Sequence, residues 1–124
     1  MSIKGLIQSE GSLSSSSVGK SRYHLPIIEV PKEVKAGEFF RIRVKVGPHP
    51  STPEHFISRV DVFISEEGRG FNPVLVATVS FTPGYVEPSI ELSIKLRKNS
   101  VIHVLSYCTL HGIWESRREV RVVE

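Results

Sequence analysis

Two short blocks and one outlying residue hold the side chains of this sequence that are best suited to bind a metal. The first block is segment 49–55 (HPSTPEH) with His49 and His55, the second is segment 108–112 (CTLHG) with Cys108 and His111, and the outlier is His24. One thiolate and four imidazoles would make a five-coordinate, electron-rich site with one open position. An open position on a redox-active metal indicates catalysis. The pattern therefore predicts a mononuclear iron site.

Each part of this pattern also has an ordinary explanation. The prolines of segment 49–55 restrict the backbone and could hold two imidazoles rigidly, but the segment could equally be a proline-rich surface loop. Cys108 and His111, three residues apart before a glycine, suit a compact two-ligand turn, yet Cys108 could be a small buried apolar residue. His24 alone carries almost no information. His103 lies within an apolar run, and we expect it to point away from the core and to bind no metal.

The elements that must position these residues are strands. Segment 38–46 alternates strongly, with Phe40, Ile42 and Val44 on one face and charged residues on the other, which is the period of a half-buried strand. No helical periodicity or internal repeat is evident. Short strands at regular spacing, separated by turn signals, predict an all-β, seven-stranded antiparallel immunoglobulin-like β-sandwich or barrel. The seven expected strands are 26–30, 38–46, 57–64, 74–81, 90–96, 101–107 and 119–123.

The chain divides into an arm and one domain. Its 124 residues suffice for a single hydrophobic core. Segment 9–21 is rich in serine and glycine and should be flexible or extended without building core. We therefore expect a flexible arm over residues 1–22 and an iron-binding β domain over residues 23–124.

The bulk composition restricts the function. The net charge is +3 and the isoelectric point is about 9.2, with basic residues interspersed among acidic ones, so a nucleic-acid surface is not indicated. A modest positive charge could still attract a small anion. The single cysteine cannot form an intrachain disulfide and suits a reducing compartment. The sequence shows no membrane span and no secretory signal, so we expect a soluble cytoplasmic protein.

Taken together, the blocks resemble the superoxide reductases, that is, the neelaredoxins and the catalytic domain of desulfoferrodoxin. This family carries a His-Val-Pro, then His-Pro-Asn-Thr-Pro-Glu-His-His, and later Cys-Asn-Leu-His-Gly. The corresponding segments here are 24–26 (HLP), 49–56 (HPSTPEHF) and 108–112 (CTLHG), and the flanking segments 82–84, 105–107 and 113–115 also match. The resemblance extends from about residue 23 to residue 123.

The resemblance implies one iron ion per chain, cycling between Fe²⁺ and Fe³⁺, and the one-electron reduction of superoxide to hydrogen peroxide. Its ligands would be four equatorial histidines and an axial cysteinate: His24, His49, His55, His111 and Cys108. The family's two-centre members bind a second iron through four N-terminal cysteines, and this chain has no cysteine before Cys108. Electrons must then come from an outside donor, which the family implies to be rubredoxin. The resemblance also implies a homotetramer.

One feature departs from the family pattern. The family usually has Glu-Lys directly before the first histidine, where the Glu occupies the sixth position of the oxidised iron and the Lys attracts superoxide. Here these positions hold Arg22 and Tyr23. Lys20 and Arg22 are the nearest cations that could attract the anion, although Arg22 could equally be an ordinary surface residue. Glu10 is the nearest acid upstream and could reach the iron only along the flexible arm.

Two other functions fit parts of the sequence. A blue-copper electron carrier is also a β-sandwich with a Cys-x-x-His element, but it needs two histidines and often a methionine, and Met1 is the only methionine here. A non-enzymatic immunoglobulin-like binding module with incidental histidines would leave the coincidence of the two blocks unexplained. The superoxide reductase interpretation accounts for both blocks.

Overall fold

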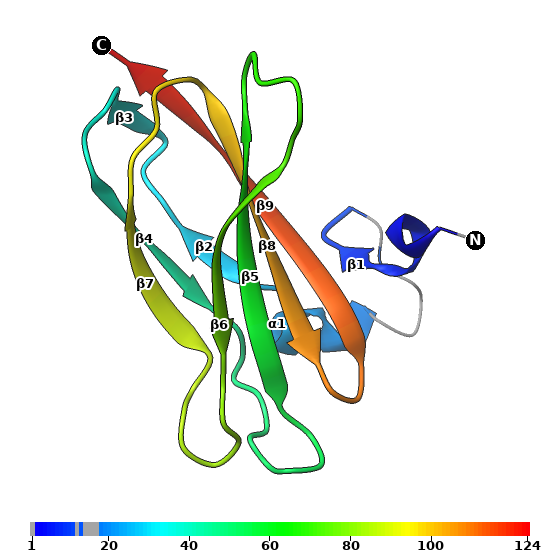
Figure 1. The fold of residues 1–124 in the computed structure, drawn as a ribbon. Coiled ribbons are helices and arrows are strands. Elements are labelled where there is room, and N and C mark those ends of the chain that lie inside the picture. Colours follow the sequence, from blue (N-terminus) through cyan, green and yellow to red (C-terminus); the bar gives the residue numbers. More distant parts are fainter. Residues whose placement is uncertain (1, 12, 14–17) are drawn as a thin grey trace.

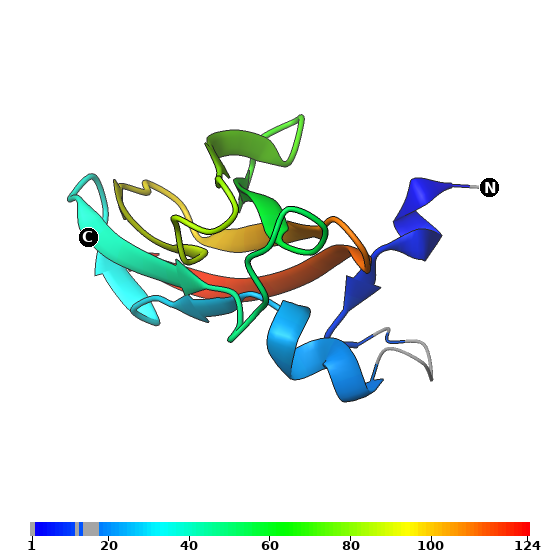
Figure 2. The same cartoon turned by 90° about the horizontal axis from the view of Figure 1, so that it is seen from below.

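Two β-sheets pack face to face around the core, as Figures 1 and 2 show in two perpendicular views. The structure is a computed structural model that describes residues 2–11, 13 and 18–124. The strands are β1 (Gln8–Ser9), β2 (Ile27–Glu29), β3 (Glu33–Lys35), β4 (Phe40–Lys45), β5 (Ile57–Glu66), β6 (Val74–Ser80), β7 (Ser89–Ile94), β8 (Ser100–Cys108) and β9 (Gly112–Val123). A short helix, α1 (Ser21–His24), and two 3₁₀ turns, Ile3–Leu6 and Val18–Lys20, precede β2.

The larger sheet has the strand order β1-β9-β8-β5-β6, and β3 also pairs with β9. The smaller sheet has the order β2-β4-β7. The long central strands β5, β8 and β9 pair antiparallel, whereas β1 and β3 each lie parallel to β9. Because β8 and β9 form a hairpin, the turn between them brings residues 108–112 to one end of the sandwich.

The alternation of β8 separates its two sets of side chains. Ile102, Val104 and Cys108 are buried and share the face that packs against the smaller sheet. His103 and Tyr107 lie on the opposite side, here called the outer face of the larger sheet, and are only partly buried. The period of two therefore confirms that His103 points away from the core. Cys108, at the end of the strand, points to the same side as the core.

The predicted fold class is confirmed: the chain is all-β and forms an immunoglobulin-like sandwich of two sheets. The number of strands differs, because the described residues form nine strands instead of seven. The additional strands β1 and β3 have only two and three residues, too few to show alternation. Strand β9 begins at Gly112, whereas the sequence predicted a start at residue 119. The prediction missed the first part of the strand because Ser116, a polar residue, occupies a buried core-facing position and interrupts the apolar alternation. Helix α1 has only four residues, too short for a periodic signal.

The N-terminal segment is more structured in part than the sequence suggested. Gln8 and Ser9 pair with Trp114 and Glu115 of β9, and Glu10 forms an ion pair with Arg118. Residues 12 and 14–17 of the expected flexible segment lie outside the described residues. The expected division into a 1–22 arm and a 23–124 domain stays a prediction. Within the described parts of the chain, no helix has both the length and the apolar character needed to span a membrane.

Candidate metal centre

Four imidazole rings stand edge to face around a common point at one end of the sandwich. His24 lies 4.8 Å from His49 and 4.9 Å from His111, measured between ring centroids. His55 completes the ring at 4.7 Å from His49 and 5.0 Å from His111. Each pair is steeply inclined, with interplanar angles of 74° to 85°. The rings therefore point their edges, which carry the nitrogens, toward the centre.

The distances between nitrogens fit a metal. His24 Nε2 lies 3.2 Å from both His49 Nε2 and His111 Nδ1. Imidazole nitrogens in one plane at about 2.1 Å from a metal would be separated by about 3.0 Å between neighbours. His55 Nε2 is buried and has no hydrogen-bond partner among the described residues, as expected of a nitrogen whose partner is a metal.

The cysteine sulfur lies beside the ring of histidines. Cys108 Sγ is 3.5 Å from His49 Nε2 and 3.8 Å from His111 Nδ1. The potential ligand atoms of His24, His49, His55 and Cys108 all lie within 4.8 Å of one another. A soft thiolate combined with imidazoles suits iron, copper or zinc, and not magnesium or calcium. The donor set thus fits the iron that the sequence predicts.

His24 reaches the centre from the end of α1. Its Nδ1 lies 2.8 Å from the carbonyl oxygen of Lys20, one helical turn earlier, and its own carbonyl oxygen accepts a hydrogen bond of 2.7 Å from Ser106. The ring stacks on Trp114 at 4.8 Å, and the residue is only 3 % exposed. These contacts hold the ring at Nδ1 and across its face, and Ser106 holds the backbone, so Nε2 is the nitrogen left to face the centre.

His49 and His55 project from the loop between β4 and β5. Gly47, at the start of this loop, has φ +118°, and a Cβ there would lie 2.6 Å from the backbone nitrogen of His49. Only glycine therefore fits this turn. His49 Nδ1 lies 2.8 Å from the carbonyl oxygen of Pro50, and backbone hydrogen bonds of 3.1 Å join Thr52 and His55 in both directions. The loop therefore orients the ring of His49 through Nδ1 and fixes the backbone from which the ring of His55 projects.

Cys108 and His111 lie at the two ends of the β8–β9 turn. The backbone N–H of His111 donates to Cys108 Sγ at 3.3 Å, which fixes the sulfur relative to the turn. The backbone N–H of Thr109 donates to the carbonyl oxygen of Phe56 at 3.0 Å, and its hydroxyl accepts from the N–H of Phe56 at 3.1 Å. These bonds tie the turn to the histidine loop. Gly112 closes the turn with φ +79°, as its position in the motif suggested.

Burial disfavours protonation of three of the imidazoles, those of His24, His49 and His111. Desolvation is the main cause that lowers the pKa of His24, His49 and His111 below the ordinary value, and the neighbouring imidazoles lower it further. Hydrogen bonds to backbone carbonyls oppose this effect at His24 and His49. A neutral imidazole presents a lone pair, so the same environment that disfavours protonation favours metal binding.

The charged residues named by the sequence analysis occupy different places. The carbonyl of Lys20 holds His24, and the positive charge of Lys20 adds to burial and to His55 in lowering the pKa of His111, so this cation lies near the centre. Arg22 is exposed, lies 4.6 Å above the ring of Tyr23 and donates a hydrogen bond to its hydroxyl. Glu10 is held by Arg118 at 2.9 Å on β9.

Sequence reasoning missed two residues that support the centre. Trp114 stacks on His24 and donates from its indole nitrogen to the carbonyl oxygen of His111 at 3.1 Å. Ser106 is fully buried and holds the end of α1 against β8. Trp114 is the only tryptophan and lies three residues after His111, a signal that could have been used. Ser106 lies in the matching flank 105–107, but its residue type did not indicate a hydrogen bond to the carbonyl oxygen of His24.

Comparison with known proteins agrees with this geometry. The Desulfoferrodoxin family model matches residues 16–117. A superoxide reductase from Pyrococcus horikoshii is 38 % identical over 103 residues, covering 78 % of this chain and 86 % of that protein. A solved structure of a superoxide reductase (neelaredoxin) from Ignicoccus hospitalis is 42 % identical, with a TM-score of 0.93 and coverage of 99 % of this chain and 100 % of the other.

A putative superoxide reductase from Thermotoga maritima gives the same result. Its solved structure is 33 % identical, has a TM-score of 0.86, and covers 100 % of this chain and 99 % of its own. The similarity therefore extends over the whole fold as well as over the histidine and cysteine motifs. This chain belongs to the desulfoferrodoxin family.

Proposed function

We propose that this chain is a superoxide reductase that converts superoxide to hydrogen peroxide with one electron and two protons. Its centre would hold one iron through His24, His49, His55, His111 and Cys108. The single observation that carries the proposal is the closed ring of four imidazoles with a cysteine sulfur beside it, in a chain of this family. Iron bound there would supply the electron by cycling between its ferrous and ferric states.

The residues around the centre have separate tasks in this proposal. The carbonyls of Lys20 and Pro50 orient two imidazoles through Nδ1, which leaves Nε2 of His24 and His49 for the metal. Cys108 would contribute a thiolate, whose electron donation to iron would favour one-electron reduction at the centre. The backbone N–H of His111 fixes that sulfur relative to the turn.

Attraction of the anionic substrate would depend on Lys20. This residue lies close enough to His111 for its charge to act there, whereas the guanidinium of Arg22 is turned toward the ring of Tyr23. Among the described residues, the group of potential ligands contains no carboxylate. A negative side chain would repel superoxide, so an imidazole and thiol site beside one lysine suits this substrate.

The finer aspects of the proposal concern its partners. The chain would take electrons from an external donor, for which rubredoxin is the candidate that the family resemblance supplies. It would act in the cytoplasm, where its single buried thiol stays reduced. It would assemble as a homotetramer, which sedimentation analysis of the purified protein would test.

The reaction can be tested by its stoichiometry. Superoxide would be generated by pulse radiolysis with the reduced protein in excess, and both superoxide loss and hydrogen peroxide would be measured. A reductase gives one peroxide for each superoxide consumed and oxidises one protein centre. Dismutation gives one peroxide for every two superoxide ions and releases dioxygen, so that ratio, or no reaction, would overturn the proposal.

A further inference from the structure

Strand β5 is irregular directly opposite the cysteine. Its pairing with β8 shifts between Ile57, which faces Cys108, and Arg59, which faces Tyr107. Ser58 is therefore the extra residue of a β-bulge, and its hydroxyl donates to the carbonyl oxygen of Tyr107 at 3.3 Å. Bulges beside functional sites redirect side chains. This bulge of β5 lies opposite Tyr107 and Cys108, the last two residues of β8, whose backbone sets the direction of the cysteine side chain.

Three side chains hold the bulge from the outer face of the larger sheet. The Tyr107 hydroxyl donates to Asp61 Oδ2 at 2.8 Å, and Arg59 Nη2 lies 3.1 Å from the same oxygen. The guanidinium of Arg59 also lies 4.3 Å from the centre of the Tyr107 ring. This group, the outer clamp, joins β5 to β8 through residues that follow the extra residue on β5.

Asp61 is an unusual residue for an open sheet face. Its side chain is only 5 % exposed, and its Oδ1 is buried with no partner in the part of the chain that the structure describes. A buried carboxylate with one unpaired oxygen is destabilising, so its partners at Oδ2 must hold it firmly. If the Tyr107 side chain moved away, Asp61 Oδ2 would lose one of its hydrogen bonds while still buried, which costs free energy. The outer clamp therefore resists rotation of β8 at Tyr107.

We propose that Arg59, Asp61 and Tyr107 are positioning residues that fix the direction of the Cys108 thiolate toward the metal. Consecutive residues of a strand point to opposite faces, so a rotation of the backbone that moved Tyr107 on one face would move Cys108 on the other. The inference rests on the proposed function, because it requires Cys108 to be a ligand. A purely structural role would change only the stability of the fold, whereas a positioning role predicts that altering these residues changes the sulfur–metal interaction itself.

The experiment compares Tyr107→Phe with Ser65→Ala. The control also removes one side-chain hydrogen bond between β5 and β8 on the same face, from Ser65 to His103 at 2.8 Å, but far from Cys108. Each protein would be loaded with iron and oxidised, and the thiolate-to-iron absorption maximum and reduction potential recorded. Affinity would be measured with cobalt(II) as the probe, and unfolding of the metal-free proteins by circular dichroism.

We expect Tyr107→Phe to shift the absorption maximum and the potential and to weaken cobalt binding by about tenfold, the lower end for loss of an outer partner. Ser65→Ala should leave all three unchanged. Asp61→Asn, which keeps an acceptor for Tyr107, should shift the band less, and the double variant should shift it no further than Tyr107→Phe alone. If Tyr107→Phe fails to fold without metal, Asp61→Asn decides the question by the same readouts.

The outcomes distinguish failure of the positioning role from failure of the proposed function. An unchanged band and potential in both clamp variants, with a normal band in the natural protein, would overturn the positioning role alone. Equal shifts in Ser65→Ala would overturn it as well, because the effect would then belong to the whole face. Absence of a thiolate band in the natural protein would overturn the proposed function.

Discussion

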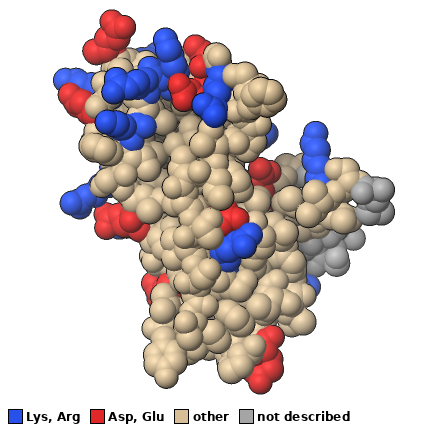
Figure 3. All heavy atoms as spheres, in the orientation of Figure 1, with Lys and Arg blue, Asp and Glu red and all other residues tan. Residues whose placement is uncertain are grey.

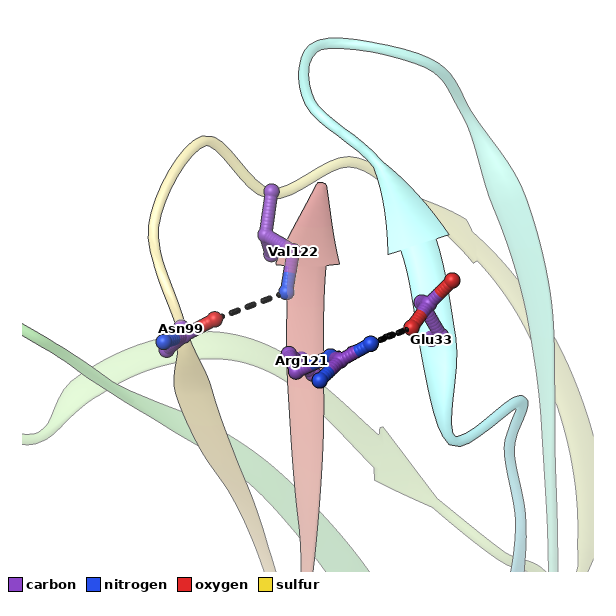
Figure 4. Close-up of polar contacts among 4 residues, drawn as sticks. All are labelled: Glu33, Asn99, Arg121 and Val122. Atoms are coloured by element: carbon purple, nitrogen blue, oxygen red, sulfur yellow. Dashed lines mark hydrogen bonds and ion pairs between the residues drawn. The ribbon is translucent and has the colours of Figure 1, made fainter. Parts of the chain in front are cut away.

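The two ends of the sandwich use polar side chains in opposite ways. At the end away from the metal centre, complementary polar groups pair, as Figure 4 shows for four residues: Arg121 Nε donates to Glu33 at 3.0 Å, and the backbone N–H of Val122 donates to Asn99 at 2.8 Å. These pairs join β3, β9 and the turn before β8. At the metal-centre end, four imidazoles and the cysteine sulfur, all potential metal ligands, face one another instead.

The charges follow the same division. On the face seen in Figure 3, lysines, arginines and acidic residues crowd the end away from the metal centre, and the metal-centre end is nearly free of them. Opposite charges side by side satisfy each other, whereas four imidazoles and a cysteine sulfur that face one point offer several donor atoms to a single metal ion. The candidate site thus differs from the charged end in gathering potential ligands where the other end pairs opposite charges. The substitutions below test that difference.

The largest effect should follow from Cys108→Ser. An alcohol cannot supply the donation of a thiolate, so the visible band of the oxidised iron protein and nearly all superoxide reduction should disappear. Absorption spectra and pulse radiolysis of the iron-loaded variant check this. A variant that keeps the band would show that another group produces it.

Two histidines on different sides of the larger sheet give the next comparison. His24→Ala should weaken metal binding by more than about tenfold, because even an outer partner contributes that much. His103→Ala should leave the affinity nearly unchanged, since His103 bonds to Ser65 and lies near Glu115 on the outer face. Calorimetric titration of both variants measures the difference. Loss of binding in His103→Ala with normal binding in His24→Ala would reverse the ligand assignment.

Cations near the centre should have a moderate effect. Lys20→Ala should lower the second-order rate with superoxide by about twofold at low salt, because one charge acting over about 10 Å in water contributes about 0.4 kcal/mol. Arg22→Ala should change it less, given its contact with Tyr23. The rates would be measured by pulse radiolysis across ionic strengths, where screening should abolish the difference. Unchanged rates in both variants would exclude the two residues from the mechanism.

Acid should destabilise the metal-free protein in a way that reflects the site. Burial lowers the pKa of His24, His49, His103 and His111 from 6.5, so the unfolded chain binds more protons than the folded one once the pH falls below about that value. Stability is therefore fully present above pH 6.5 and falls as the pH decreases, by at most about 1.4 kcal/mol per pH unit for each histidine kept neutral. Urea unfolding between pH 7.5 and 5 checks this.

Glu33→Gln provides the control from the opposite end. It breaks an exposed ion pair, so it should lower stability by less than about 1 kcal/mol and leave the pH dependence unchanged. A stability that stays flat between pH 7.5 and 5 in the natural protein would contradict the burial of neutral imidazoles.

Alternating strands are a local pattern, so the fold class could be predicted from the sequence, and the spacing within segments 49–55 and 108–112 marked four of the candidate ligands. His24 joined them only through the family resemblance. The short spacing of Cys108 and His111 predicted that one turn holds both, and the glycine that follows indicated where this turn ends. The contacts of Ser106 with α1 and of Asp61 with Tyr107 could not be predicted, since each depends on strand register. Ser116 hid most of β9, because a buried serine interrupts the apolar pattern.

The central claim is that His24, His49, His55, His111 and Cys108 together hold one iron. X-ray absorption spectroscopy at the iron edge of the purified protein, combined with metal analysis, tests it most directly. We predict about one iron per chain with one sulfur and four nitrogens from imidazole in its shell. Copper or zinc as the only bound metal with no iron taken up on reconstitution, or an iron shell without sulfur, would contradict the account.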